Sequence, residues 1–285
     1  MIKLIVSDMD GTLITHHSKI SQKNLEAIRH AQKHGADFVI ATGRDFHSMK
    51  DIIADHGISC MAILGNGAQF VDEKGHLLSS AYFPKEHFQK VIEIFDELNI
   101  HYMIFSDHGP FSTHDPQEVC DAFIHRCCVQ FHRQIEDYQE ETNMPCMHLK
   151  HIENVANFLK SDIQIIKVEA FSIDVELIAQ AKEKLKEIEG IAYLSSFNDN
   201  VEVTDQHAQK GLILEEVIEK IGIQKDEVMV LGDGFNDLTM FERFPYSFAP
   251  ANAEEGIKKL AYRVVKACED DGVAQAIYMM IPKGN

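Results

Sequence analysis

Largely apolar runs alternate with helix-like stretches through the first 64 residues of the chain. The runs Leu4–Ser7, Asp37–Ala41 and Cys60–Leu64 lack the alternation of half-exposed strands, so they predict strands buried on both faces. Between them, apolar residues at helical spacing predict helices over about 21–34 and 46–56, and a serine caps the first. Strands that alternate with helices in this way indicate a parallel sheet with helices on both faces.

The same alternation returns near the end of the chain. The elements predicted there are a helix over 209–221, strands at 227–231, 246–249 and 263–266, and a final helix that begins at Val273. After the third strand of the first part, a turn at Glu73–Gly75 indicates a hairpin over 69–83.

The middle of the chain has a different pattern, in which helices alternate with hairpins. The predicted elements are helices over 85–98, 116–128 and 175–188, a strand at 165–171, and hairpins formed by 100–106 with 110–113 and by 192–197 with 200–204. This pattern favours an antiparallel α+β module inserted into the parallel one. The secondary structure of the segment 129–163 is the hardest to predict from this pattern.

Together these patterns predict an α/β fold, with a doubly wound, Rossmann-like parallel-sheet core and an inserted α+β domain. We expect the core to comprise residues 1–83 and 205–285, and the inserted domain to comprise residues 84–204. A chain of 285 residues is long enough for one large or two medium domains.

The charge of the chain narrows the classes of partner. The sequence has 45 acidic and 27 basic residues, a formal net charge of -18 at pH 7. Such a chain is not expected to bind nucleic acid or an anionic membrane, although a few local cations suffice for a small phosphorylated ligand. No stretch reaches the roughly 20 apolar residues of a membrane span, and no signal-peptide pattern is visible, which favours a cytoplasmic protein.

The six cysteines show no framework spacing, so we expect free thiols in a reducing cytosol. His125, Cys127, Cys128 and His132 lie close together in the sequence. They lack the paired spacing of a structural zinc site, and we interpret them as helix-surface and core residues.

The candidate chemistry begins directly after the first predicted strand, where residues 8–13 read Asp-Met-Asp-Gly-Thr-Leu. Residues two apart on an extended chain point the same way, so Asp8 and Asp10 are expected to face one pocket. Two adjacent carboxylates favour a bound cation, a division into acid and base, or both. Gly11 permits a tight turn whose amides could hold an anion.

Three further segments fall at strand or helix ends. Thr42 and Gly43 follow the second strand and offer a hydroxyl and an amide to an anion. Lys210 is expected near the start of a helix, where the helix dipole already favours anions. Asp233 and Asp237 follow the strand that ends at residue 231. In open parallel sheets ligands bind at the carboxyl ends of the strands, and such a cluster of carboxylates suits Mg²⁺.

In this order the four segments resemble the motifs of the haloacid dehalogenase superfamily. The chain is similar to its Cof-type phosphatases, which have a type 2, subclass B cap between the second and third motifs. The segments that carry the resemblance are residues 8–13, Thr42 within Ala41–Arg44, Lys210, residues 232–240, Asn66–Ala68 and Asp271–Ala274. One departure is visible, because Ala249–Ala253 contains Pro250 where relatives often read Ala-Met-Gly-Asn-Ala, although Asn252 is kept.

The resemblance implies a phosphatase that forms a phosphoaspartyl intermediate with Asp8 as nucleophile and Asp10 as general acid and base. The implied ligands of Mg²⁺ are Asp8, the backbone carbonyl of Asp10, Asp233 and Asp237, of which the last also orients Lys210. The implied substrate and phosphate contacts are Gly11, Thr42, Gly43, Arg44, Asn66, Lys210 and Asn236. The inserted cap is expected to select the substrate, a small phosphomonoester such as a sugar phosphate.

Two other functions remain open. A phosphomutase shares this fold and nucleophile, and a non-catalytic phosphate-binding or regulatory protein shares the arrangement of acids around a parallel sheet. The presence of Asp10 favours a hydrolase, because relatives with long-lived aspartyl phosphates often replace that acid. The expected partner is a small phosphorylated metabolite, and the expected assembly is a monomer or a small homo-oligomer.

Overall fold

The computed structural model divides the chain into two compact units. The first unit comprises Met1–Ser80 and His207–Asn285, and the second comprises Ala81–Gln206. The chain therefore passes between units at 80/81 and 206/207, whereas the sequence pattern had suggested 83/84 and 204/205. The structure describes residues 1–15, 19–132, 134–138, 144–195 and 197–283.

The first unit is built on an eight-stranded sheet with the order β14-β13-β12-β1-β2-β3-β4-β5. Neighbours from β14 to β3 pair in parallel, and β4 and β5 add an antiparallel hairpin at the edge. The strands are β1 Leu4–Ser7, β2 Asp37–Ala41, β3 Met61–Leu64, β4 Gln69–Val71, β5 Leu77–Ser80, β12 Val228–Leu231, β13 Tyr246–Pro250 and β14 Arg263–Val265.

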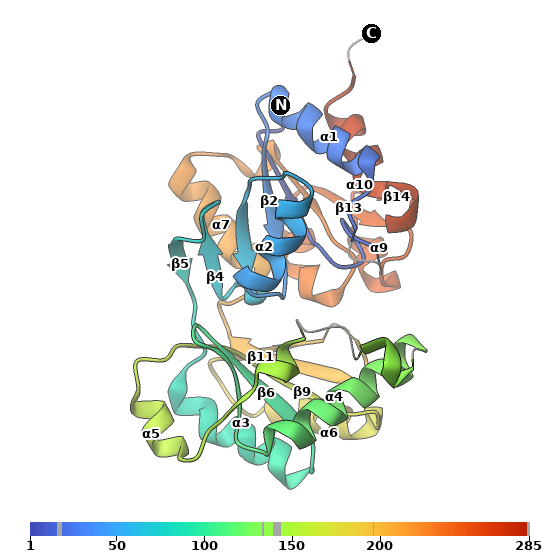
Figure 1. Cartoon of the computed structure of the whole chain (residues 1–285). Coiled ribbons are helices and arrows are strands. Elements are labelled where there is room, and N and C mark those ends of the chain that lie inside the picture. The colour runs from blue at the N-terminus through green and yellow to red at the C-terminus, as the bar shows by residue number, and fades with distance from the viewer. Residues whose placement is uncertain (16–18, 133, 139–143, 196, 284–285) are drawn as a thin grey trace. The chain divides into compact units, whose positions relative to one another are not determined.

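Helices cover both faces of this sheet (Figure 1). One face packs against α1 Gln22–Lys33, α2 Phe46–Asp55 and α10 Gly272–Met280, and the other against α7 Lys210–Ile221, α8 Leu238–Arg243 and α9 Glu255–Leu260. Strand β1 supplies both layers, because Ile5 enters the first apolar core whereas Leu4 and Val6 enter the second. Full burial on both faces explains why these strands are continuous apolar runs.

The second unit has a six-stranded sheet with the order β10-β11-β9-β6-β7-β8, in which only β7 and β8 pair in parallel among the residues described. One face of the sheet forms an apolar core with α3, α5 and α6, and the other packs in part against α4. The elements are α3 Lys85–Glu97, β6 His101–Ser106, β7 Gly109–Ser112, α4 Pro116–Phe131, β8 Lys150–His151, α5 Val155–Lys160, β9 Ile165–Phe171, α6 Val175–Leu185, β10 Ile191–Leu194 and β11 Asn200–Asp205.

Six short 3-10 helices complete the described structure. They are η1 Gly65–Gly67, η2 Ile135–Tyr138, η3 Pro145–His148, η4 Lys225–Glu227, η5 Phe235–Asp237 and η6 Cys268–Asp270.

The predicted fold class is confirmed, and most element boundaries agree within a few residues. The hydroxyl of Ser21 accepts a hydrogen bond from the amide of Asn24 (3.1 Å) and caps α1, as the sequence indicated. Four predicted ends are wrong by three residues, because α4 continues to Phe131 whereas α6 stops at Leu185, β5 at Ser80 and β10 at Leu194.

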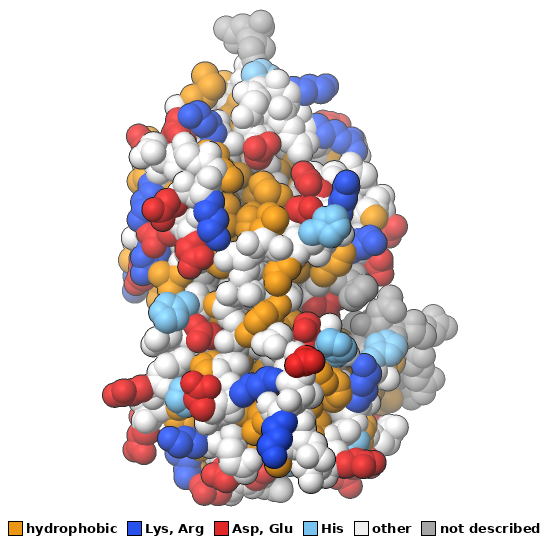
Figure 2. All heavy atoms as spheres, turned by 90° about the vertical axis from the view of Figure 1, so that its left-hand side faces the viewer, with side chains coloured by type: hydrophobic (Ala, Val, Ile, Leu, Met, Phe, Trp, Pro, Cys, Tyr) orange, Lys and Arg blue, Asp and Glu red, His pale blue; other side chains and the backbone are white. Residues whose placement is uncertain are grey.

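The surface agrees with a mixed rather than a basic charge pattern. On the face drawn in Figure 2, acidic and basic side chains are interspersed. No helix within the described parts of the chain is long and apolar enough to span a membrane.

Candidate active site

Three neighbouring strands of the first unit end beside the residues that carry the predicted chemistry. Strand β1 lies between β2 and β12, and all three run in parallel. Asp8 follows β1, Thr42 follows β2, and Asp233 lies two residues after β12. The amide of Asp8 donates to the carbonyl oxygen of Leu231 (2.9 Å), so main-chain pairing aligns two of these strand ends. The sheet therefore brings the three segments to one edge, as expected for ligand sites in parallel sheets.

Lys210 joins this edge as the first residue of α7. Its side chain is fully buried, and its Nζ lies 2.5 Å from Asp8 Oδ1 and 2.6 Å from Asp237 Oδ1. Burial alone would lower the pKa of Lys210, but the charges of Asp237 and Asp8 outweigh it and raise that pKa above its ordinary value. A charged ammonium group therefore sits between two carboxylates.

Asp237 has contacts on both of its carboxylate oxygens. Oδ1 accepts from Lys210, and Oδ2 accepts from the amides of Asp233 (2.9 Å) and Gly234 (3.1 Å). A Cβ at Gly232 would lie 2.4 Å from Asp237 Cγ, so only glycine fits at that position without a shift. These contacts orient both Lys210 and the loop that follows β12.

The surroundings of Asp8 and Asp233 disfavour a negative charge on either carboxyl group. Burial raises the pKa of Asp8 well above its usual range, and although the Lys210 ammonium opposes this, Asp237 and Asp233 add to it. Burial, followed by the Asp237 charge, raises the pKa of Asp233 to about 6. Both carboxyls would be stabilised in the ionised form by an added cation.

The geometry of these carboxylates fits a divalent metal. Asp8, Asp233 and Asp237 each offer one oxygen, and these oxygens all lie within 4.8 Å of one another. Thr12 Oγ1 donates to Asp233 Oδ1 (2.7 Å) and holds that side chain in place. Gly11 has a φ of +81°, and a Cβ there would lie 2.5 Å from Asp233 Oδ2, so the turn leaves room for the carboxylate. Clustered hard oxygen ligands are those that Mg²⁺ prefers.

Asp10 pairs with Arg44, whereas Asp8 pairs with Lys210. The side chain of Asp10 is about half exposed, and it forms a two-point ion pair with Arg44, in which Nε lies 2.8 Å from Oδ2 and one terminal nitrogen 2.6 Å from Oδ1. Burial alone would lower the pKa of Arg44, but its hydrogen bond to Asp10 and the charges of Asp10 and Asp8 raise it above its ordinary value. The guanidinium group is therefore charged.

The remaining predicted residues lie in the loops of the same edge, in contact with one another. The amide of Arg44 donates to Thr42 Oγ1 (3.2 Å), and Asn236 Nδ2 donates to Asn66 Oδ1 (3.3 Å). The amide of Gly11, expected to hold an anion, donates to the carbonyl oxygen of Ile14 (3.1 Å). The part that each residue plays toward a substrate stays a prediction.

Three side chains that were not predicted as site residues also support the site. Thr12 lies within the first motif, so its contact with Asp233 could have been inferred from its neighbours. Asn252 Nδ2 donates to the carbonyl oxygen of Gly11 (2.8 Å). Pro250, the departure noted in the sequence, is the last residue of β13 and does not prevent this contact. Thr239 Oγ1 accepts from the amide of Gly211 beside Lys210, and a sequence gives no sign of such a pairing.

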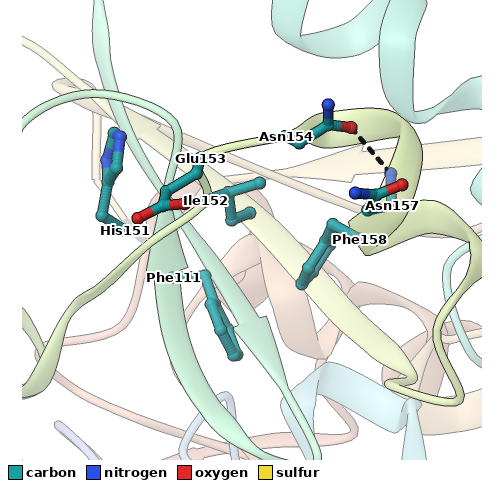
Figure 3. Close-up of a pocket in the computed structure, with 7 residues that line it drawn as sticks. All are labelled: Phe111, His151, Ile152, Glu153, Asn154, Asn157 and Phe158. Carbon is teal, nitrogen blue, oxygen red and sulfur yellow. Dashed lines mark hydrogen bonds between the residues drawn. The ribbon is translucent and has the colours of Figure 1, made fainter.

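A hollow of about 320 Å³ in the second unit is a weaker candidate (Figure 3). Asn154 Oδ1 accepts from the amide of Asn157 there (2.9 Å), so its oxygen caps α5. The lining offers one carboxylate and no lysine or arginine, so it lacks the fixed cations that suit a phosphate. Its residues are Phe111, His151, Ile152, Glu153, Asn154, Asn157 and Phe158.

Comparison with known proteins identifies the family that the chain resembles over nearly its whole length. Residues 5–277 match the family model described as haloacid dehalogenase-like hydrolase. The chain is 26% identical over 278 residues to phosphatase YwpJ of Bacillus subtilis, covering 96% of this chain and 98% of that protein. It is 28% identical over 283 residues to the 5-amino-6-(5-phospho-D-ribitylamino)uracil phosphatase YwtE of the same organism, covering 98% of each.

Solved structures show the same fold. A haloacid dehalogenase-like hydrolase from B. subtilis superposes with a TM-score of 0.84 at 25% identity, covering 97% of this chain and 99% of that one. The subclass IIB sugar phosphatase BT4131 superposes with a TM-score of 0.78 over 99% of this chain and 100% of its own, and its 19% identity supports likeness of fold alone.

Proposed function

The chain belongs to the haloacid dehalogenase-like hydrolase family, and from this premise we propose that it is a Mg²⁺-dependent phosphatase of small phosphomonoesters that uses Asp8 as its nucleophile. The observation that carries the proposal is the buried contact of Asp8 with Lys210, beside Asp233 and Asp237 at one sheet edge. This arrangement supplies a nucleophile, a fixed cation and metal ligands within a few ångströms, which phosphoryl transfer requires.

We propose that Asp8, the backbone carbonyl of Asp10 and Asp233 hold the Mg²⁺, with Asp237 bound directly or through water. A bound Mg²⁺ neutralises charge on the transferring phosphoryl group. The hydrogen bonds that Asp237 already accepts from Lys210 and from the loop after β12 favour an orienting role for this residue. Thr12 keeps Asp233 turned toward the cluster.

The reaction proceeds in two displacements. In the first, a carboxylate oxygen of Asp8 attacks phosphorus, an oxygen–phosphorus bond forms, and the bond to the leaving oxygen breaks as Asp10 protonates it. In the second, Asp10 takes a proton from water, the water oxygen attacks phosphorus, and the bond to Asp8 breaks to release phosphate. Lys210 and the hydroxyl of Thr42 bind the transferring oxygens throughout.

Arg44 holds the side chain of Asp10 at two points before substrate binds. Its two-point pair occupies both carboxylate oxygens of Asp10, whereas the first displacement requires Asp10 to give a proton to the leaving oxygen. We propose that the anionic substrate draws Arg44 away from Asp10, so that this carboxyl is free to face the leaving oxygen. Gly11, Gly43 and Asn236 remain candidates for further contacts with the phosphoryl group.

The second unit is proposed to select the substrate, with residues 84–204 as its functional extent. A module that closes over the reacting group excludes water and contacts the leaving group. YwtE is named for a small phosphorylated metabolite and BT4131 is named a sugar phosphatase, and we propose a ligand of the same class here, a sugar phosphate or a related metabolite. All six cysteines are free thiols, which supports the proposal of a reducing cytosol.

The experiment that tests the function is a phosphate-release screen of purified protein with Mg²⁺. The panel contains p-nitrophenyl phosphate beside sugar, nucleotide and cofactor phosphates. Asp8→Asn is expected to abolish release, whereas Asp51→Asn on the exposed side of α2 serves as the matched control and keeps it. Phosphate retained and moved to a second hydroxyl would instead indicate a phosphomutase, and hydrolysis by Asp8→Asn would contradict the mechanism.

A further inference from the structure

The turn Gly65–Gly67 leads from β3 toward β4 beside the site, and all three of its residues have left-handed backbone. The φ angles are 56° at Gly65, 59° at Asn66 and 112° at Gly67. Glycine adopts this region freely, whereas most side chains make it unfavourable, and asparagine is one of the few that tolerate it. Asn66 is also fully buried. A buried asparagine with this backbone needs surroundings that compensate for its strain.

The main chain of this turn is hydrogen-bonded to the loop that follows β2. The amide of Asn66 donates to the carbonyl oxygen of Thr42 (3.0 Å), and the amide of Gly65 donates to that of Arg44 (3.1 Å). These two hydrogen bonds lie on either side of Gly43. The turn therefore holds the segment that presents the Thr42 hydroxyl.

The side chain of Asn66 adds contacts with two loops. Its Oδ1 accepts from Asn236 Nδ2 (3.3 Å), in the loop that follows β12. A Cβ at Gly43 would lie 3.0 Å from the same Oδ1, so the side chain packs directly against the loop that follows β2. One amide thus contacts both loops that were assigned to the phosphoryl group.

Gly67 adds contact with the third segment. A Cβ at Gly67 would lie 2.6 to 2.8 Å from the backbone atoms of Gln209, the residue directly before Lys210. The turn consequently packs against the start of α7, where the site lysine is placed. Its three residues meet the three segments that carry Thr42, Asn236 and Lys210.

We propose that Asn66 is a positioning residue of the reaction, which sets the spacing of Thr42, Asn236 and Lys210 through its left-handed backbone and its side-chain amide. This inference rests on the proposed function. It departs from a direct substrate contact, because the side chain is fully buried and its oxygen accepts from Asn236. Positioning errors of about 1 Å cost up to about 100-fold in rate.

The principal test compares Asn66→Gly with Asn99→Gly. Asn99 has nearly the same backbone, with a φ of 54°, but lies in the second unit at the exposed turn between α3 and β6. Both variants keep the left-handed backbone and lose only the side chain. We expect Asn66→Gly to lower kcat for p-nitrophenyl phosphate by about 10-fold to 100-fold with at most about a tenfold rise in KM, and Asn99→Gly to match wild type.

A second readout does not depend on turnover. Inorganic phosphate with Mg²⁺ is titrated calorimetrically into wild type and both variants, and we expect Asn66→Gly alone to bind about tenfold more weakly. If wild type neither hydrolyses nor binds phosphate, the proposed function fails. If wild type does either and Asn66→Gly equals it, the positioning role is overturned. A rise in KM at unchanged kcat would indicate a direct substrate contact and would also overturn it.

Gly43→Ala tests the same contact without altering Asn66. The added methyl crowds Asn66 Oδ1, so kcat should fall several-fold, and unchanged kcat would count against the proposal even where Asn66→Gly does not fold. The double variant combines Gly43→Ala with Asn66→Gly and lacks the Asn66 side chain that the added methyl would crowd. Its loss of kcat should therefore equal that of Asn66→Gly alone, whereas strictly additive losses would show that the two positions are not coupled.

Discussion

Each unit of the protein buries one lysine between two carboxylates, and the two clusters differ in what surrounds them. In the first unit, Lys210 contacts Asp8 and Asp237 at the carboxyl edge of the parallel sheet. In the second, Lys167 Nζ lies 3.0 Å from Glu169 Oε2 and 2.5 Å from Glu202 Oε2. Both lysines have a raised pKa, because their carboxylate partners outweigh the effect of burial.

The clusters occupy different places on their sheets. Glu169 and Glu202 are direct cross-strand partners on β9 and β11, and Lys167 lies two residues along β9 on the same face. Arg126 of α4 reaches this face and lies 2.7 Å from Asp199 Oδ1. The cluster of the second unit thus lies within paired strands, whereas that of the first lies where strands end and loops begin.

The charge balance separates the two clusters further. The cluster of the first unit sets four carboxylates against two cations, namely Asp8, Asp10, Asp233 and Asp237 against Lys210 and Arg44. That of the second sets three carboxylates against two cations, namely Glu169, Glu202 and Asp199 against Lys167 and Arg126. The cluster of the first unit thus has an excess of two negative charges, which one Mg²⁺ would neutralise. A buried lysine pair is therefore poor evidence of a site until the local charge is counted.

The largest expected effect comes from Lys210→Met. Loss of the ammonium removes a cation from the transferring oxygens, and we expect kcat to fall by about 1,000-fold in a phosphate-release assay with Mg²⁺. A residual rate within tenfold of wild type would mean that Lys210 has no such role. The matched change in the second unit, Lys167→Met, should leave kcat for p-nitrophenyl phosphate nearly unchanged.

The second prediction concerns stability rather than rate. Lys167→Met leaves Glu169 and Glu202 facing each other without a cation, and we expect the free energy of unfolding to fall by about 3–5 kcal/mol in urea titrations. Replacing both glutamates by glutamine in the same variant should restore part of the loss. Comparable stability of Lys167→Met and wild type would show that this cluster contributes nothing to the fold.

The third prediction uses the raised pKa of Asp233, about 6 in the metal-free protein. The folded protein binds a proton there between about pH 4 and pH 6, where the unfolded chain does not, so the penalty of its charge is full above that window and is relieved as the pH falls through it. Mg²⁺ should therefore raise Tm more at about pH 7.5 than at about pH 5.

Differential scanning calorimetry of EDTA-treated protein, with and without Mg²⁺, measures this difference. Asp233→Asn is the control, because it should show little gain in Tm at either pH. Equal gains for wild type at the two pH values would contradict the assigned environment of the carboxyl.

The smallest effect is expected from Arg44→Met. The pair with Asp10 is substantially exposed, so the free energy of unfolding should change by less than about 1 kcal/mol, while kcat/KM falls by about tenfold through loss of substrate contact. Arg263→Met at the exposed edge strand β14 is the matched control for loss of charge. A large loss of stability with unchanged kcat/KM would assign Arg44 a structural role instead.

The sheet of the first unit could be predicted because its strands are buried on both faces and leave continuous apolar runs. The gathering of Asp8, Thr42 and Asp233 followed from the rule that parallel strands end at one edge. The short elements could not be predicted in this way. Helices α5, α8 and α9 have six residues each and β8 has two, too few to show a period.

The geometry within the site was also beyond the sequence. Which carboxylate would contact Lys210, and which would contact Arg44, depends on side-chain directions at loops rather than on periodicity. The left-handed backbone of Asn66 could be predicted in part, because the sequence has a glycine on each side of it. Its contacts with Gly43 and Asn236 join segments far apart in sequence, and no local pattern shows them.

The central place of β1 has a consequence for synthesis on the ribosome. Asp8 directly follows a strand whose partner on one side, β12, is translated about two hundred residues later. A nascent chain that ends at residue 206 contains Asp8 but lacks β12, Lys210, Asp233 and Asp237. Long-range pairing of this kind forms late, so the emerging chain has an unpaired apolar strand edge until β12 is made. Chemistry therefore begins only after the last third of the polypeptide has been made.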